Sequence, residues 1–226
     1  MLEIGPGTGQ ATRALAERLY DITAIELGPN LASVARANLA SYTNVRVIVA
    51  PFEDWPLPAQ PYDAVVSASA FHWLEPQTGL SKSAEALRPG GSLAVIGTHH
   101  IDGGTEQFFL DAQVCYERWT QTEPGFRLPK GADVPYVEAD LVGSAEFDPW
   151  VFRRYEWERE YSAADYVGLQ STYSEIRALE ERTRESLLGC IATLINGRYG
   201  GRVRKRHLNQ LMIARRRAGA PRPVRA

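Results

Sequence analysis

The chain begins with a short apolar segment that leads directly into a glycine-rich turn. Residues 2–9 read Leu-Glu-Ile-Gly-Pro-Gly-Thr-Gly, and residues 10–19 place their apolar side chains at the spacing of one helix face. The apolar run predicts a buried parallel strand that turns into a helix. Glycines leave room for a ligand beside the helix N-terminus, so the pattern predicts a nucleotide-type site at this turn.

The spacing of the glycines separates two kinds of nucleotide site. Gly5, Gly7 and Gly9 form G-x-G-x-G, whereas the fingerprint of nicotinamide enzymes is G-x-G-x-x-G/A. A second predicted strand ends at Glu26, whose carboxylate can accept hydrogen bonds from ribose hydroxyls in either kind of site. A nicotinamide-dependent oxidoreductase therefore remains an alternative.

The turn and three later segments resemble the class I S-adenosylmethionine-dependent methyltransferases, in particular the small-molecule enzymes with a methyltransferase type 11-like domain. Glu3, Gly5, Gly7 and Gly9 match motif I of that family, (D/E)-x-G-x-G-x-G. The later segments are residues 45–55, 62–66 and 87–93. The resemblance implies S-adenosyl-L-methionine as the cofactor, held by motif I, by Glu26 on the ribose, and by Glu53 or Asp54 on the adenine.

The order of predicted elements indicates an α/β fold. Helices are expected near residues 10–19, 30–39 and 78–87, between strands that end near Ile4, Glu26, Val49, Ala70 and Thr98. This alternation predicts a Rossmann-like doubly wound sheet. The resemblance implies seven strands, with an insertion after strand five and the last two strands at residues 151–161 and 203–214. Family members carry a segment before strand one, so we expect that strand to be truncated and an N-terminal segment to be missing.

The chain divides into four predicted parts. Residues 1–100 form the cofactor-binding core, residues 101–150 an insertion, residues 151–217 the rest of the core sheet with helices, and residues 218–226 a flexible tail. The insertion is rich in aromatic residues. It either caps the substrate or packs only on itself, and both interpretations remain open.

His72 is the candidate catalytic base, because imidazole titrates near neutrality and the residue follows the predicted fourth strand. A histidine that only hydrogen-bonds a loop backbone is the alternative. Trp73, His99 and Phe108 are the candidate substrate contacts. Three histidines without suitable carboxylates do not make a metal site, so no metal is predicted. A fold that binds the cofactor without turnover is a further alternative.

Composition and short motifs restrict the expected cellular location and the class of methyl acceptor. No apolar run approaches the ~18 residues of a membrane span, and no secretory signal is visible, so we expect a cytoplasmic protein.

Cys115 and Cys190 are interpreted as reduced core thiols. No D/N/S-P-P-Y/F tetrapeptide follows strand four, which favours a small-molecule acceptor over nucleic acid. The nine Lys and Arg residues from Arg202 onward are interpreted as a strand with a solvated face. No feature fixes an oligomeric state.

Overall fold

The structure is a computed structural model that describes residues 1–120, 125, 127–136 and 144–218. Parts of the predicted insertion and residues 219–226 of the predicted tail lie outside the described residues.

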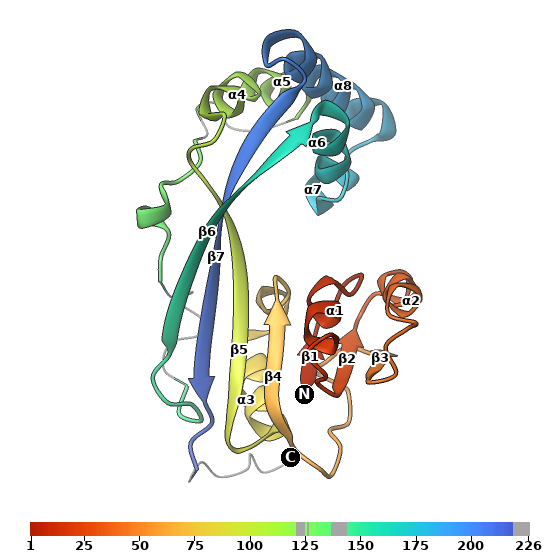
Figure 1. Cartoon of the computed structure of the whole chain (residues 1–226), viewed down its shortest axis with the longest axis vertical. Coiled ribbons are helices and arrows are strands. Elements are labelled where there is room, and N and C mark those ends of the chain that lie inside the picture. Colours follow the sequence, from red (N-terminus) through yellow and green to blue (C-terminus); the bar gives the residue numbers. More distant parts are fainter. Residues whose placement is uncertain (121–124, 126, 137–143, 219–226) are drawn as a thin grey trace. The chain divides into compact units, whose positions relative to one another are not determined.

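A seven-stranded sheet has the strand order β3-β2-β1-β4-β5-β7-β6 (Figure 1). The strands are β1 Leu2–Ile4, β2 Ile22–Glu26, β3 Val45–Val49, β4 Tyr62–Ala68, β5 Leu87–Ile101, β6 Val151–Ser162 and β7 Arg202–Arg215. The first five strands are parallel to one another, whereas β7 runs opposite to β5 and β6. The predicted Rossmann-like, seven-stranded sheet is confirmed.

Helices follow the strands close to the predicted positions. The first three are α1 Gln10–Ala16, α2 Pro29–Asn38 and α3 Pro76–Ala86. Two short helices follow β5, namely α4 Glu106–Asp111 and α5 Gln113–Trp119. Between β6 and β7 lie α6 Ala163–Gln170, α7 Ser174–Arg177 and α8 Glu181–Arg198, and two short 3-10 turns, Phe71–Trp73 and Gly131–Asp133, complete the described elements.

The chain divides into two compact units. Unit 1 comprises residues 1–98, 135–154 and 209–226, and unit 2 comprises residues 99–134 and 155–208. Strands β5, β6 and β7 contribute residues to both units, and helices α4 to α8 belong to unit 2. Unit 2 therefore joins part of the predicted insertion to helices that the sequence assigned to the core sheet.

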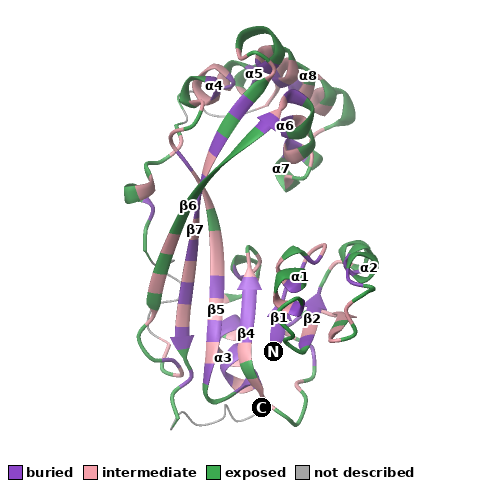
Figure 2. Cartoon of the chain, in the orientation of Figure 1, coloured by how far each residue is buried: buried purple, intermediate pink, exposed green. Residues whose placement is uncertain are grey.

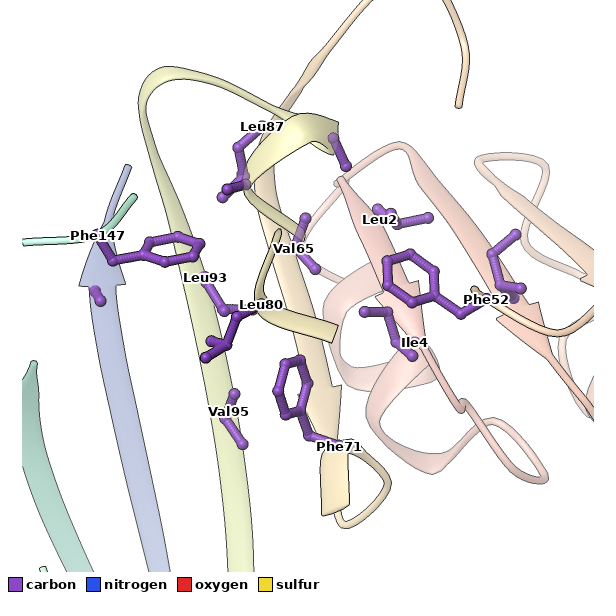
Figure 3. Packing of buried hydrophobic residues seen from close by; sticks show 14 of the residues in the cluster. Leu2, Ile4, Phe52, Val65, Phe71, Leu80, Leu87, Leu93, Val95 and Phe147 are labelled. Carbon is purple, nitrogen blue, oxygen red and sulfur yellow. The ribbon is translucent and has the colours of Figure 1, made fainter. Parts of the chain in front are cut away.

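The sheet of unit 1 is covered on both faces. Leu2 and Ile4 point to one face, where they pack with Val65, Phe52 and Phe71, as Figure 3 shows, and with α3. Ala16 of α1 packs with Ile22 and Ala24 of β2 in a second cluster. Because side chains alternate along a strand, Glu3 points away from Leu2 and Ile4. The burial of β1 and β4 is visible in Figure 2.

None of the helices in the described part of the chain has the length and apolar character needed to cross a membrane.

The two cysteines form a disulfide within unit 2, which corrects the prediction of reduced thiols. Cys115 of α5 and Cys190 of α8 lie 75 residues apart in sequence, with their Cα atoms 5.9 Å apart. The helices pack around a shared core that includes Phe108, Leu187 and Ile191. No local spacing signals such a long-range pair. In a chain-entropy account, closing a loop of this size stabilises the fold by about 4 kcal/mol.

The basic residues of β7 alternate between two environments. Arg202, Arg204 and Arg206 are paired with acids of β6, namely Glu160 for Arg202 and Arg204, Glu158 for Arg204, and Glu156 for Arg206. Val203, Lys205 and His207 are buried. The predicted strand with a solvated face is confirmed, and its exposed cations lie beside carboxylates.

Candidate functional site

The carboxyl ends of four parallel strands meet at one edge of unit 1. Ile4 is in register with Ile25 of β2 and with Ser67 of β4, and Glu26 is in register with Val49 of β3. The segments that follow these strands therefore begin at the same edge. The sheet brings together the glycine turn, Glu26, the segment after β3 and the segment after β4.

The glycine turn approaches β4 closely and leaves an open space beside it. Gly5, Gly7 and Gly9 have φ values of +66°, +59° and +92°. A Cβ on Gly5 would overlap the Cβ of Ala70, so no larger residue fits there. By contrast, a Cβ on Gly7 would meet no atom within 4 Å. Gly7 borders room that a ligand can fill.

Glu26 ties the glycine turn to the loop after β2. The Gly7 N–H donates to Oε2 of Glu26 at 2.9 Å, and the Gly28 N–H donates to Oε1 at 2.8 Å. The side chain is buried. A carboxylate has about four acceptor positions, so two amide donors leave capacity for hydroxyl donors of a ligand. Sequence analysis did not identify Gly28, although its place directly after the acid-bearing strand was a usable signal.

Glu3 lies beneath the turn and not at its surface. Its side chain is 1% exposed, and its Oε2 has no hydrogen-bond partner among the described residues. Burial raises the pKa of Glu3 to about 7, while the Thr12 hydroxyl opposes the shift. The side chain is thus poised to change charge near neutral pH.

The segment after β3 presents its acids and buries its aromatic ring. Phe52 is 3% exposed and packs in the core of unit 1, so its ring is not available to cover a ligand. Glu53 is half-buried and Asp54 is exposed. Lys82 donates to the backbone oxygen of Glu53 at 2.6 Å, which fixes the turn. Both carboxylates remain candidates for a ligand contact.

His72 and Trp73 lie on a short 3-10 turn after β4. Both side chains are exposed, with their ring centroids 5.1 Å apart, whereas Phe71 beside them is buried. Among the described residues, His72 makes no hydrogen bond to a loop backbone. The alternative role, in which the histidine only holds a loop in place, therefore gains no support. The imidazole is accessible at the carboxyl edge.

The other two predicted substrate contacts lie in unit 2. Phe108 is fully buried and packs edge-on against Phe109, Tyr166 and Tyr199, so the structure corrects its predicted role as a direct contact. Unit 2 contains a cavity of about 550 Å³ that is lined by Phe109 and His100 and not by Phe108 or His99.

The fold and this edge define a class of protein. A doubly wound sheet with a G-x-G-x-G turn after its first strand and an acid after its second is typical of Rossmann-like domains that bind nucleoside cofactors. Residues 2–95 match the methyltransferase domain family. The match covers less than half of the chain.

The chain is similar to named methyltransferases in sequence and in fold. An uncharacterized methyltransferase of Mycobacterium tuberculosis is 35% identical over 96 residues, which cover 42% of this chain and 38% of the relative. The chain thus spans well under half the length of that relative. A putative type II methyltransferase of Anaeromyxobacter dehalogenans has a TM-score of 0.62 at 23% identity, covering 96% of this chain and 88% of the other.

A further solved structure carries a product of the cofactor. Phosphoethanolamine N-methyltransferase 2 of Haemonchus contortus, in complex with phosphomonomethylethanolamine and S-adenosylhomocysteine, has a TM-score of 0.52 at 14% identity. The match covers 96% of this chain and 48% of the other. At this identity the likeness establishes the fold.

Glu3 should make the stability of unit 1 depend on pH. Its folded pKa of about 7 lies above the ordinary value of 4.5, so the folded state holds the proton more tightly and stability falls as pH rises from 4.5 to 7. The loss is on the order of 3 kcal/mol. Urea unfolding at several pH values in this range measures the free energy of unfolding of the wild type and of Glu3→Gln. As pH rises, the wild type should lose stability relative to the variant, because glutamine does not titrate. A difference that does not change with pH would contradict the prediction.

Proposed function

We propose that the carboxyl edge of unit 1 binds S-adenosyl-L-methionine and that the protein transfers its methyl group to a small-molecule acceptor. The observation that carries the proposal is the carboxylate of Glu26, buried between the amides of Gly7 and Gly28 in a methyltransferase domain. The open space at Gly7 and the spare acceptor capacity of Glu26 fit such a cofactor. The match of residues 2–95 to the methyltransferase domain family supports this cofactor over a nicotinamide.

Each element of the edge has a proposed task. The backbone of Gly5, Gly7 and Gly9 lies against the methionine part of the cofactor, and Glu26 accepts hydrogen bonds from the ribose hydroxyls. Glu53 or Asp54 accepts from the adenine amino group. Adjacent side chains in extended backbone point apart, so we expect one of the two acids to participate.

The cofactor supplies an electrophilic methyl group on a positively charged sulfur. The protein's contribution is to hold the acceptor in line with that methyl group and to exclude water. An acceptor that is neutral must also lose a proton, and exposed His72 is our candidate to take it. Trp73 beside it offers an apolar surface to the acceptor.

The class of acceptor is proposed from the segment after β4. Ser69-Ala70-Phe71-His72 stands where enzymes that methylate exocyclic amino groups of DNA carry D/N/S-P-P-Y/F. This favours a small molecule. A cytoplasmic location remains a prediction from the sequence, and the Cys115–Cys190 disulfide, a bond that is rare in that compartment, argues against it.

Gly7→Val should abolish binding of S-adenosyl-L-methionine, because its methyl groups would occupy the space that borders Gly7. Isothermal titration calorimetry measures the affinity. Gly200→Val is the matched control: Gly200 has a φ of +61° and no atom within 4 Å of an added Cβ, but it lies in unit 2. The control should bind like the wild type. Equal affinity in a folded Gly7→Val protein, or no binding by the wild type, would overturn the cofactor assignment.

The acids of the edge should contribute unequally to cofactor affinity. Glu26→Ala should weaken binding by about 1–3 kcal/mol, the range for hydrogen bonds to a charged partner. Of Glu53→Gln and Asp54→Asn, one should weaken binding and the other should not. Glu185→Gln, an exposed acid on α8, serves as the control. Unchanged affinity in Glu26→Ala would refute its ribose contact, and unchanged affinity in both other variants would refute the adenine site.

His72→Ala should reduce turnover at least tenfold while leaving cofactor affinity within about twofold, since a base acts on the acceptor and contributes about 10²–10⁴-fold. Transfer of labelled methyl groups to acceptors in a deproteinised cell extract provides the assay, with its pH profile as a second readout. Full turnover by His72→Ala would exclude a base role and indicate an acceptor that arrives ionised. Cofactor binding without any transfer would favour a non-catalytic module.

A further inference from the structure

Unit 2 contains a cavity whose lining residues all come from that unit. Its volume is about 550 Å³, within the range of about 300–1,000 Å³ that small-molecule sites occupy. The wall includes four aromatic rings, contributed by Phe109, Tyr116, Tyr166 and Tyr173. It also includes Lys205 of β7 and His100 at the end of β5. Four aromatic rings thus share the wall of the cavity with several polar and charged side chains.

Lys205 is a buried cation on the inward face of β7. Arg204 and Arg206, its neighbours in sequence, are ion-paired with acids of β6. Lys205 points the other way, is only 3% exposed, and forms no ion pair with any residue in the described ranges. Its Nζ donates to the Tyr173 hydroxyl at 3.3 Å and lies 5.7 Å from the Tyr166 ring centroid.

The Tyr173 hydroxyl and the rings of Tyr166 and Tyr173 compensate the ammonium ion of Lys205 only in part. Burying a charge is costly unless it is paired and hydrogen-bonded, and an ammonium group has three donors. Burial lowers the pKa of Lys205 to about 8, so the group is still mostly protonated at pH 7. The ammonium group of Lys205 is therefore a buried positive charge without an ion-pair partner among the described residues.

Four groups near Lys205 are neutral at pH 7, and four of the five other charged residues of the wall are exposed. Burial, assisted by the charge of Lys205, lowers the pKa of His100 to about 4, and burial likewise lowers the pKa of His207 to about 4. Burial raises the pKa values of Tyr166 and Tyr173, which keeps both phenols neutral. The remaining charged groups of the wall are Asp102, Glu106, Arg127, Lys130 and Glu175. Glu106, Arg127, Lys130 and Glu175 are exposed.

We propose that this cavity binds a small organic acid with an aromatic or similarly flat apolar body, and that the anionic group of this ligand contacts Nζ of Lys205. The four rings accept the body of the ligand, and the anion supplies the missing partner of the lysine. The proposal is independent of methyl transfer, because it requires only residues of unit 2. No comparison assigns a ligand to this unit.

A pair of probes of equal shape tests the proposal. 2-Naphthoate carries a carboxylate, and 2-naphthamide replaces it with a neutral amide. Calorimetric titration of the full chain should show naphthoate binding at least tenfold tighter than naphthamide at pH 7. In Lys205→Met the preference for naphthoate should vanish while naphthamide binding is retained. Arg204→Met removes a cation from the opposite face of the same strand and should leave both affinities unchanged.

The pH dependence of the wild type provides a second measurement if Lys205→Met fails to fold. Naphthoate affinity should fall about tenfold between pH 7 and pH 9, as a lysine with a pKa near 8 loses its charge, while naphthamide affinity stays constant. Lys130→Gln should show the same fall, which excludes the exposed lysine as its source. The proposal is overturned if the wild type binds neither probe, if folded Lys205→Met keeps the preference for naphthoate, or if naphthoate affinity does not change with pH. Loss of cofactor binding in unit 1 would leave these outcomes untouched.

Discussion

The carboxyl edge of unit 1 depends on the carboxylate of Glu26. Two backbone amides, from loops that follow different strands, donate to its two oxygens. A buried carboxylate requires such donors, and the two amides would otherwise lack a partner of equal strength. The same side chain is the proposed acceptor for the ribose. The proposed cofactor site is therefore shaped before a ligand arrives, and little ordering of the turn remains to oppose binding.

A second constraint, the alternation of side chains along β7, organises unit 2. Arg202, Arg204 and Arg206 face acids of β6, whereas Lys205 and His207 face inward. The arginines on one face of β7 therefore form ion pairs with β6, whereas Lys205 on the other face lines the cavity. Exposed ion pairs contribute about 0–1 kcal/mol each, but an unpaired buried charge alters what the cavity can bind. From composition alone, the basic residues from Arg202 onward form a single basic segment, and these two roles cannot be told apart.

Much of unit 1 could be predicted because its signals are local. The strand, glycine turn and helix over residues 2–19 follow from periodicity and from residues without a Cβ, and the register of parallel strands then places Glu26, Asp54 and His72 at one edge. Unit 2 is different. Its disulfide joins residues 75 positions apart, and its cavity combines the end of β5 with α4 to α7 and β7. No sequence spacing reports such contacts.

The sequence alone does not show which residue of a neighbouring pair lines the cavity of unit 2. Phe109 lines it and Phe108 does not, and His100 lines it and His99 does not. In an extended segment adjacent side chains point to opposite faces, and in a helix they differ by about 100°. Periodicity reveals that one face is apolar, but an aromatic pair such as Phe108-Phe109 fits the core and the cavity equally well in sequence. The choice is made by Tyr166 and Tyr199, which enclose Phe108 from elements far along the chain. Tertiary packing thus decides which of two neighbouring residues remains open to a ligand.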